Sequence, residues 1–274
     1  MTDERRPTAP PPPAEPPGHG LLAGKVAVVT AAAGTGIGSA TARRLLLEGA
    51  RVVISDAHER RLGETAAVLA KLAESLGGSA DGTPLAIPCD VTDETQVREL
   101  FRAAEERHGR IDVVVNNAGL GGTANLVDMT DDEWHRVVDV TLTGTFRCTR
   151  AALRSLRRQG SGVIVNNASV LGWRAQAGQA HYAAAKAGVM ALTRSAALEA
   201  APFGIRINAV APSLAMHPFL AKVTSDELLD ELAGREAFGR AAEPWEVATV
   251  IAFLASDYSS YMTGEVVSVS SQHP

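Results

Sequence analysis

The stretch VVTAAAGTGIGSATARRLLLEGARVVISD, residues 28–56, decides the fold. It runs from an apolar segment into closely spaced glycines, then into an Ala/Leu-rich segment, and it ends with a second apolar segment that closes on an aspartate. Short apolar runs are typical of buried parallel strands, and the longer Ala/Leu-rich segment is typical of a helix. The stretch therefore predicts a strand, a glycine-rich turn, a helix and a second strand.

The same alternation continues to the C-terminus. Short β-branched runs, apolar on both faces, predict seven parallel strands at 25–30, 51–56, 84–90, 111–117, 162–169, 205–212 and 264–270. Helical patterns long enough for right-handed crossovers separate them, at 37–48, 59–76, 93–108, 131–158, 181–202, 225–233 and 244–255. We expect a single α/β domain over 21–274, a doubly wound Rossmann-type fold with helices on both faces of the sheet.

The first 20 residues, MTDERRPTAPPPPAEPPGHG, are rich in proline and carry almost nothing apolar. Such a composition cannot offset the entropy of ordering, so residues 1–20 are predicted to form a disordered arm. A proline-rich arm can dock an SH3-like partner, but a solvated tail is the favoured interpretation. The arm lacks the apolar region of a secretory signal, and no apolar run is long enough to span a bilayer.

Charge and cysteine content narrow the class of partner. With a formal net charge of -5 and a pI near 5.8, the chain offers no broad basic surface for nucleic acid or an anionic membrane. Cys89 and Cys148 lie far apart without CxxC or metal-ligand spacing, so neither a disulfide framework nor a metal site is expected. The sequence favours a cytoplasmic protein that acts on a small molecule.

The glycine cluster lies at the carboxyl end of the first predicted strand, where doubly wound sheets bind ligands. Glycines there let the backbone approach a pyrophosphate, whose charge lies at the N-terminus of the following helix. A flexible turn is the alternative, and the cluster alone is a weak signal. The predicted phosphate-binding residues are Gly34, Thr35, Gly36, Ile37 and Gly38.

Asp56 ends the second predicted strand, 18 residues after Gly38. A carboxylate at this place accepts hydrogen bonds from the adenosine ribose hydroxyls and repels a 2′-phosphate. The predicted cofactor is therefore NAD rather than NADP. His58, Arg60 and Arg61 follow closely; the favoured interpretation is that they form the solvated start of a helix, and the alternative is that they soften the preference for NAD.

Tyr182 and Lys186 are four residues apart in HYAAAKAGVMALTRSAALEA, so they share one face of a predicted helix. A nearby positive charge favours the phenolate, which would bring the pKa of Tyr182 closer to neutral pH. Tyr182 then qualifies as a general acid or base.

With these motifs the chain resembles the classical short-chain dehydrogenase/reductase family from about residue 21 onward. The family's YxxxK pair falls on Tyr182 and Lys186, its catalytic serine falls on Ser169, and its NNAG signature falls on 116–119. The resemblance implies that Ser169 bonds the substrate oxygen, that Tyr182 moves its proton, and that Lys186 binds the nicotinamide ribose and lowers the tyrosine pKa.

The resemblance also implies further cofactor contacts. Asp90 and Val91 match the pair that holds the adenine ring, and RINAVAP matches the strand that runs into the nicotinamide loop. The residues implied are Asp90, Val91, Asn117, Ala118, Gly119, Ala215 and His217, together with the glycine loop, Asp56, Tyr182 and Lys186.

The chain departs from the family pattern at two places before the tyrosine. Ala31 replaces the usual first glycine, and the loop is one residue longer before Gly36, so a reshaped pyrophosphate turn is expected. Thr141 stands where the family carries the asparagine of its proton relay. Because a threonine can still bond a main-chain carbonyl or a water, a modified relay is expected.

Two departures follow the tyrosine. Ser213 and His217 replace a glycine and a threonine in PSLAMH, and Ser270 and Ser271 replace a C-terminal double glycine. His217 has three open interpretations: it bonds the nicotinamide, it faces the substrate, or it is a solvated loop histidine.

The expected function is that of an NAD-dependent dehydrogenase or ketone reductase. The alternatives are an NADPH-dependent 3-oxoacyl thioester reductase and a dinucleotide-binding regulatory protein without catalysis. Alanine-rich helices at 131–158 and 181–202 predict a homotetramer, or at least a dimer.

The segments GHGLLAGK, NNASVLGWRAQAGQAHYAAAKAGVMALTR and FGRAAEPWEV are similar to a subgroup of actinobacterial dehydrogenases of steroid breakdown. That resemblance implies an acyl-CoA thioester of a hydroindane ring remnant as the substrate. Residues near the catalytic set then have two roles: Trp173, Leu171 and Met216 offer an apolar wall, and Arg174, Gln176 and Gln179 meet a polar tail.

Overall fold

A computed structural model describes residues 11–77, 82–216 and 226–271. Its centre is a parallel sheet of seven strands in the order β3-β2-β1-β4-β5-β6-β7. The strands are β1 Val26–Val29, β2 Arg51–Asp56, β3 Leu85–Pro88, β4 Val113–Asn116, β5 Gly162–Asn167, β6 Ile205–Pro212 and β7 Val266–Val269. The order reverses between β1 and β4, and this place is the topological switch point of the sheet.

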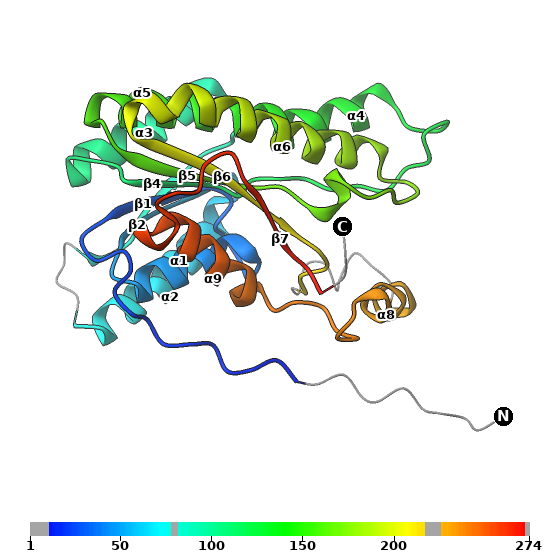
Figure 1. The fold of residues 1–274 in the computed structure, drawn as a ribbon, viewed down its shortest axis with the longest axis horizontal. Helices are drawn as coiled ribbons and strands as arrows, with labels where there is room; N and C mark the ends of the chain where they lie inside the picture. The colour runs from blue at the N-terminus through cyan, green and yellow to red at the C-terminus, as the bar shows by residue number, and fades with distance from the viewer. Residues whose placement is uncertain (1–10, 78–81, 217–225, 272–274) are drawn as a thin grey trace.

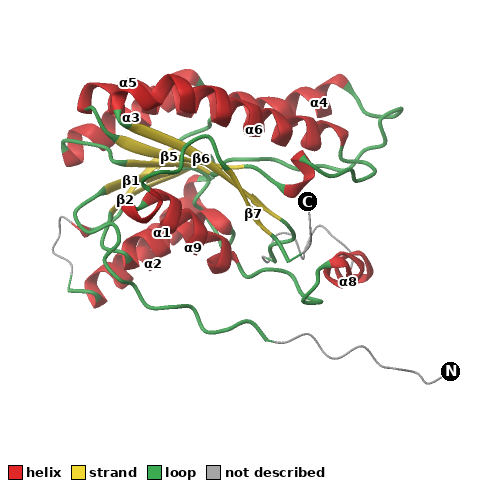
Figure 2. Cartoon of the chain, viewed as in Figure 1, coloured by secondary structure: helices red, strands yellow, loops and turns green. Residues whose placement is uncertain are grey.

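Helices cover both faces of the sheet (Figure 1). On one face lie α1 Ile37–Leu47, α2 Glu59–Ser75 and α9 Pro244–Ala255. On the other lie α3 Glu94–His108, α4 Asp131–Val138, α5 Gly144–Gln159 and α6 Ala180–Ala200, while α8 Asp226–Arg235 stands apart beyond β7. Figure 2 shows the yellow strands between these two red layers, so the predicted doubly wound Rossmann-type fold is confirmed.

The strands are apolar throughout because both of their faces are buried. On β1, Ala27 and Val29 pack into the core beneath α1 and α9, whereas Val26 and Val28 pack into the core beneath α3 and α5. A strand that faced water on one side would instead alternate with polar residues. Within the described ranges, no helix combines the length and the apolar character that crossing a bilayer requires.

The predicted helix over 131–158 contains a break that its sequence pattern does not show. A π-helical turn, Asp139–Thr143, separates α4 from α5. Such turns insert one extra residue into a helix and often lie at functional sites. Here the turn contains Thr141, the residue at the place of the family's asparagine.

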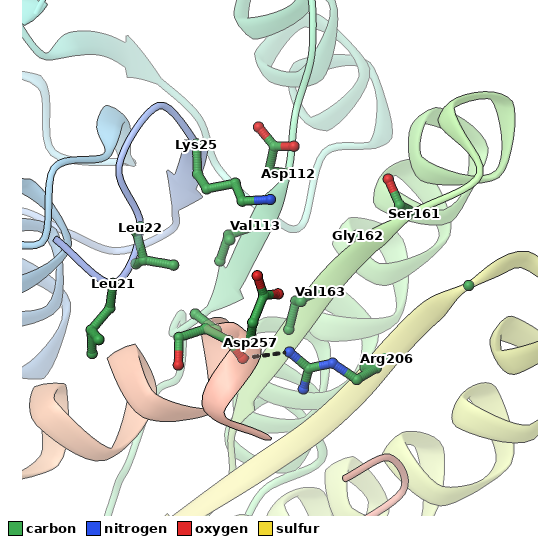
Figure 3. A pocket seen from close by; sticks show the side chains of 13 residues that line it. Leu21, Leu22, Lys25, Asp112, Val113, Ser161, Gly162, Val163, Arg206 and Asp257 are labelled. Carbon is green, nitrogen blue, oxygen red and sulfur yellow. Dashed lines mark hydrogen bonds between the residues drawn. The ribbon is translucent and has the colours of Figure 1, made fainter. Parts of the chain in front are cut away.

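A cavity of about 130 Å³ opens at the amino ends of β1, β4, β5 and β6 (Figure 3). Lys25, Asp112, Arg206 and Asp257 bring charge to its wall. Arg206 donates to Leu254 O at 3.1 Å and to Ser256 O at 2.9 Å, so it holds the last turn of α9. This edge of the sheet is opposite to the carboxyl ends where the glycine loop lies.

The chain before β1 is bound to α1 through a buried ion pair. Arg44 and Glu48 form this pair with side chains only 3% and 0% exposed. Arg44 donates to Pro16 O at 2.5 Å and to Pro17 O at 3.1 Å, and Glu48 accepts from the His19 N–H at 2.9 Å. These contacts, with burial opposing them, hold the pKa of Glu48 below its ordinary value.

Close backbone contact accompanies these bonds. A Cβ atom on Gly18 would lie 2.0 Å from Leu47 O, so only glycine lets the arm pass the end of α1 at this point. The buried ion pair in α1 thus binds the main chain of Pro16, Pro17 and His19, and the disordered arm over residues 1–20 stays a prediction. Residues 1–10 of the predicted arm lie outside the described residues.

Removal of residues 1–20 should lower the free energy of unfolding by roughly 1–3 kcal/mol, since two charged side chains lose hydrogen-bond partners. Urea denaturation of the truncated and full-length proteins measures the change. Removal of residues 1–10 alone keeps every contact described above and serves as the matched control. Equal denaturation midpoints for the two truncations would show that the bound arm adds nothing to stability.

Candidate active site

The predicted catalytic residues lie together at the carboxyl edge of the sheet. Ser169 follows β5, Tyr182 and Lys186 lie in the first turns of α6, and Thr141 comes from the π-helical turn. The helix pattern of α6 places Tyr182 and Lys186 on one face, and the switch point of the sheet brings β1 and β4 beside them.

Ser169 and Tyr182 are joined by a hydrogen bond between their side chains. Ser169 Oγ also accepts the Leu171 N–H at 3.2 Å, so its O–H is the group that donates toward Tyr182. Ser169 is 8% exposed, so this hydroxyl lies in a largely water-excluded place. A donor held in this way is suited to an oxygen that develops negative charge.

Lys186 is buried beside this pair. Its Nζ donates to Asn167 O at 2.5 Å and lies 5.6 Å from the centroid of the Tyr182 ring. Burial lowers the pKa of Lys186 to about 8, because a charged amine is costly away from water. The ammonium therefore bonds a main-chain oxygen and lies over the tyrosine ring.

Lys186 is expected to lower the pKa of Tyr182, but burial of the tyrosine has the larger effect on this pKa in the structure. Burial raises the pKa of Tyr182 above its ordinary value, and the hydrogen bond with Ser169 is the contribution that lowers it. The prediction of a pKa closer to neutral is therefore wrong for this structure. The physical reason is that desolvation penalises the phenolate, whereas the ammonium is engaged with Asn167 O.

Thr141 holds the loop that carries the NNAG signature. Its Oγ1 accepts the Leu120 N–H at 3.0 Å and donates to Leu120 O at 3.2 Å. The side chain is fully buried. A Cβ atom on Gly119 would lie 3.3 Å from Lys186 Nζ and 3.8 Å from Thr141 Oγ1, so this threonine is part of the same cluster.

The glycine loop begins α1 without a side-chain cap. Gly36 is the N-cap residue and makes no side-chain cap bond, so the loop from Thr35 leads directly into Ile37 and Gly38 at the start of the helix. N–H groups at such an end are unsatisfied by the helix itself and suit an anion. Gly34, with φ of 86°, differs because its N–H already donates to Thr65 Oγ1 at 3.0 Å.

Ala31 keeps a glycine-like backbone conformation in the turn. Its φ is 49°, and among the described residues it is the only non-glycine residue with a positive φ. An L-residue adopts this left-handed conformation only against steric cost. The sequence indicated the replacement of a glycine here, and the structure shows that the glycine-like backbone is kept.

The NNAG segment is bonded to the end of β1. Thr30 Oγ1 accepts the Asn117 N–H at 3.0 Å and the Ala118 N–H at 3.2 Å. Asn117 Nδ2 in turn donates to Thr30 O and Ala31 O. This network joins the ends of β1 and β4 on either side of the switch point.

Asp56 ends β2 as predicted, and its carboxylate is partly exposed. Oδ2 accepts the Ala33 N–H at 3.2 Å and Oδ1 accepts the His58 N–H at 2.9 Å, so the carboxylate is held against the glycine loop. Arg60 pairs with Glu64 at 2.7 Å. That pair directs this arginine along α2, which supports the interpretation of Arg60 as part of a solvated helix start.

The remaining predicted cofactor residues lie around this edge. Asp90 Oδ1 accepts two bonds from Thr92, and Val91 is 6% exposed, with Gly144 of α5 next to its side chain. Ala215 lies beyond β6 and bridges to Ala242. His217 lies outside the described residues, so its three interpretations stay predictions.

A groove of about 530 Å³ is lined by Leu126 and by residues of the segment from Trp173 to Ala183, which follows Ser169 and contains the start of α6. Leu126 and Trp173, 70% and 42% exposed, form apolar walls, and Arg174 and Gln176 bring polar groups. Of the residues predicted to contact the substrate, Leu171, Met216 and Gln179 do not line this groove. Gln179 instead donates to Thr123 Oγ1 at 3.2 Å, because the two loops meet there.

Sequence reasoning missed the roles of Thr30, Thr65, Leu126 and Asn167. The doubled asparagine at the end of the apolar run GVIVNN is the one signal that could have indicated Asn167, since buried amides need partners. Leu126 and Thr65 carry no such signal.

The residues at this edge fit a dinucleotide. The uncapped start of α1 can take a pyrophosphate, and Asp56 can take the adenosine ribose. Asn167 Oδ1 is buried and accepts no hydrogen bond from the part of the chain that the structure describes. This oxygen is therefore available to accept a hydrogen bond from a bound dinucleotide.

Comparisons with known proteins agree with this geometry. The family model described as "Enoyl-(Acyl carrier protein) reductase" matches residues 31–271. A protein of Mycobacterium tuberculosis named (5R,7aS)-5-hydroxy-7a-methyl-1-oxo-2,3,5,6,7,7a-hexahydro-1H-indene-carboxyl-CoA reductase is 68% identical, over 96% of this chain and 98% of its own. Cis-4-hydroxycyclohexanecarboxylate dehydrogenase of Sinomonas cyclohexanicum is 45% identical, over 90% of this chain and 96% of its own.

A solved structure extends the similarity to three dimensions. The crystal structure of a short chain dehydrogenase from Mycobacterium smegmatis has a TM-score of 0.83 and 63% sequence identity, and the match covers 96% of this chain and 98% of that one. The similarity in sequence and in fold runs over nearly the whole chain. The protein therefore belongs to the short-chain dehydrogenase/reductase family.

Proposed function

We propose that this protein interconverts a secondary alcohol and a ketone with NAD, and that its substrate is a hydroindane carried as a CoA thioester. Members of the family are oxidoreductases that use NAD or NADP. The observation that carries the reaction type is the cluster of Ser169, Tyr182 and Lys186 at the carboxyl edge of the sheet.

Each residue of the cluster has a chemical task in this proposal. Ser169 donates its O–H to the substrate oxygen, and Tyr182 accepts the hydroxyl proton during oxidation or returns it during reduction. Lys186 offers a cation beside the tyrosine ring, and Thr141 keeps the loop around Gly119 in place. The bound dinucleotide supplies the hydride acceptor or donor.

Asp56 supports NAD as the cofactor. Its carboxylate lies at the end of β2, where a 2′-phosphate would meet negative charge. The hydrogen bonds from the Ala33 and His58 N–H groups hold this carboxylate against the glycine loop. Because Arg60 pairs with Glu64, that arginine is not set toward the ribose.

The groove formed by Leu126 and by residues between Trp173 and Ala183 supports the substrate class. Trp173 and Leu126 can cover the faces of an alicyclic ring, and Arg174 can bond the oxygens of a thioester tail. The relative that is 68% identical is named for an indene-carboxyl-CoA substrate. We propose the catabolic direction, in which oxidised NAD draws the alcohol toward the ketone.

We also propose that the protein works in the cytoplasm as a homotetramer. Phe146 on α5 and Leu198 on α6 are 40% and 79% exposed. Apolar side chains of this size are commonly covered when they lie on helices that pack between subunits.

A single kinetic comparison tests the proposed function. Alcohol oxidation is measured with a hydroxylated hydroindane carboxyl-CoA, its free acid and a straight-chain 3-hydroxyacyl-CoA, each with NAD and with NADP. We expect the bicyclic thioester with NAD to have a kcat/KM at least about tenfold above every other combination, as one well-placed charged contact can provide.

Each arm of this comparison can overturn one part of the proposal. Equal use of the free acid removes the CoA thioester from the substrate class, and equal use of the linear thioester removes the ring. Equal or better use of NADP removes the assignment of Asp56. Turnover of none of the substrates with either cofactor would favour a non-catalytic dinucleotide-binding protein.

A further inference from the structure

Asn167, the last residue of β5, contacts two parts of the site at once. Its main-chain oxygen accepts the Lys186 ammonium at 2.5 Å. Its side-chain Nδ2 donates to Asn117 Oδ1 at 2.8 Å. The residue is only 9% exposed, so both bonds are largely shielded from water.

The bond between the two asparagines has one possible direction. Asn117 Nδ2 donates to Thr30 O at 3.2 Å and to Ala31 O at 3.0 Å. Main-chain carbonyls only accept hydrogen bonds, so the amide nitrogen of Asn117 must face them and its oxygen must face Asn167. Asn167 therefore has to present its NH₂ group, which a hydrophobic residue could not do.

The far end of this chain of bonds is the strained turn of the glycine loop. Ala31 has a φ of 49°, a conformation that persists in a non-glycine residue only when its surroundings hold it. The hydrogen bond from Asn117 Nδ2 to Ala31 O is one of the contacts that stabilise this conformation. Asn167, in turn, fixes the amide of Asn117.

We propose that Asn167 is a positioning residue that couples the nucleotide loop to the catalytic lysine. Its side chain keeps Asn117, and thereby the Ala31 turn, in the geometry that receives a dinucleotide, while its main-chain oxygen keeps Lys186 in place. The inference rests on the proposed function, which assigns a dinucleotide to this loop and a catalytic role to Lys186.

A purely structural role for Asn167 predicts a different result, and the neighbouring residue provides the comparison. Asn166 is fully buried and bonds on the opposite face of β5, where its Nδ2 donates to Thr193 Oγ1 at 2.8 Å and its Oδ1 accepts from Asn116 at 2.8 Å. Loss of either amide should lower stability. Only loss of the Asn167 amide should weaken dinucleotide binding.

The test is a fluorescence titration of NADH with wild type, Asn167→Leu and Asn166→Leu, together with denaturant unfolding of each. We expect the dissociation constant for NADH to rise about tenfold in Asn167→Leu, the size of one lost buried hydrogen bond, and about twofold at most in Asn166→Leu. Partial unfolding lowers the amount of active protein without raising that constant. Asn167→Asp, which keeps the shape and removes the donor, replaces Asn167→Leu if the latter does not fold.

A double variant tests the coupling itself. If Asn167 acts through Asn117, then Asn117→Ala with Asn167→Leu should bind NADH no more weakly than Asn117→Ala alone. Multiplicative losses, an unchanged dissociation constant in Asn167→Leu, or an equal rise in Asn166→Leu would each overturn the proposal. If wild type binds NADPH and not NADH, the cofactor choice fails, and the same series with NADPH still decides the role of Asn167.

Discussion

Tyr182→Phe should lower kcat for alcohol oxidation by about 10²- to 10⁴-fold, the usual contribution of a positioned general acid or base. The variant keeps the aromatic ring that Lys186 faces at 5.6 Å and removes only the hydroxyl that bonds Ser169. We therefore expect the fold and the dissociation constant for NADH to change little. Steady-state kinetics and NADH titration measure the two effects separately.

The pH profile provides a second readout of the same residue. Because burial raises the pKa of Tyr182, the phenolate is scarce at neutral pH, and oxidation by the wild-type protein should accelerate as the pH rises. The residual activity of Tyr182→Phe should lack that acceleration.

Tyr258→Phe is the matched control for this variant. Tyr258 is 77% exposed at the end of α9, away from the carboxyl edge, so loss of its hydroxyl should leave kcat unchanged. If Tyr182→Phe kept wild-type turnover, or if Tyr258→Phe lost as much, Tyr182 would not be the proton-transfer group.

Gly38→Ala should abolish dinucleotide binding at millimolar NADH and lower the free energy of unfolding by about 1–3 kcal/mol, as overpacked sites do. A Cβ atom at this position would lie 2.1 Å from Ala31 O and 2.5 Å from Asn117 Nδ2. Both distances are too short for any real contact, and the first neighbour is main chain. The added methyl group therefore has to displace the turn that the Asn117 amide holds.

Gly63→Ala on α2 is the matched control for the glycine. A Cβ atom there meets nothing within 4 Å, so the substitution should be neutral or stabilise the helix by roughly 0.5–1 kcal/mol. NADH titration and thermal unfolding of both variants measure the contrast. Tight NADH binding by Gly38→Ala would show that the loop tolerates displacement and that Gly38 is not required for the site.

The two predictions test different parts of the site, namely a reacting group and the hydrogen-bonded framework around it. Tyr182→Phe removes one reacting group from an intact framework, whereas Gly38→Ala disturbs the framework that joins the ends of β1 and β4. The same framework explains why Asn167 matters, because Gly38 packs directly over the bond between Asn117 and Ala31.

The sequence by itself determined the seven strands and most of the helices, but not the π-helical break at Asp139–Thr143. Apolar runs such as GVIVNN became β5 within two residues of the predicted end, because burial of both faces leaves a local pattern. The spacing of Tyr182 and Lys186 likewise determined that they share a helix face, since that depends only on the helical period.

Only the tertiary structure determined the pKa values, the hydrogen-bond partners and the backbone strain of these groups. The raised pKa of Tyr182, the binding of Pro16 and Pro17 to Arg44, and the strained turn at Ala31 all depend on partners far away in the chain. The same holds for Asn167, whose side chain bonds a residue 50 positions away and whose main-chain oxygen bonds one 19 positions away. Hydrogen bonds and desolvation act through distances in space, and no local pattern of residue types encodes those distances.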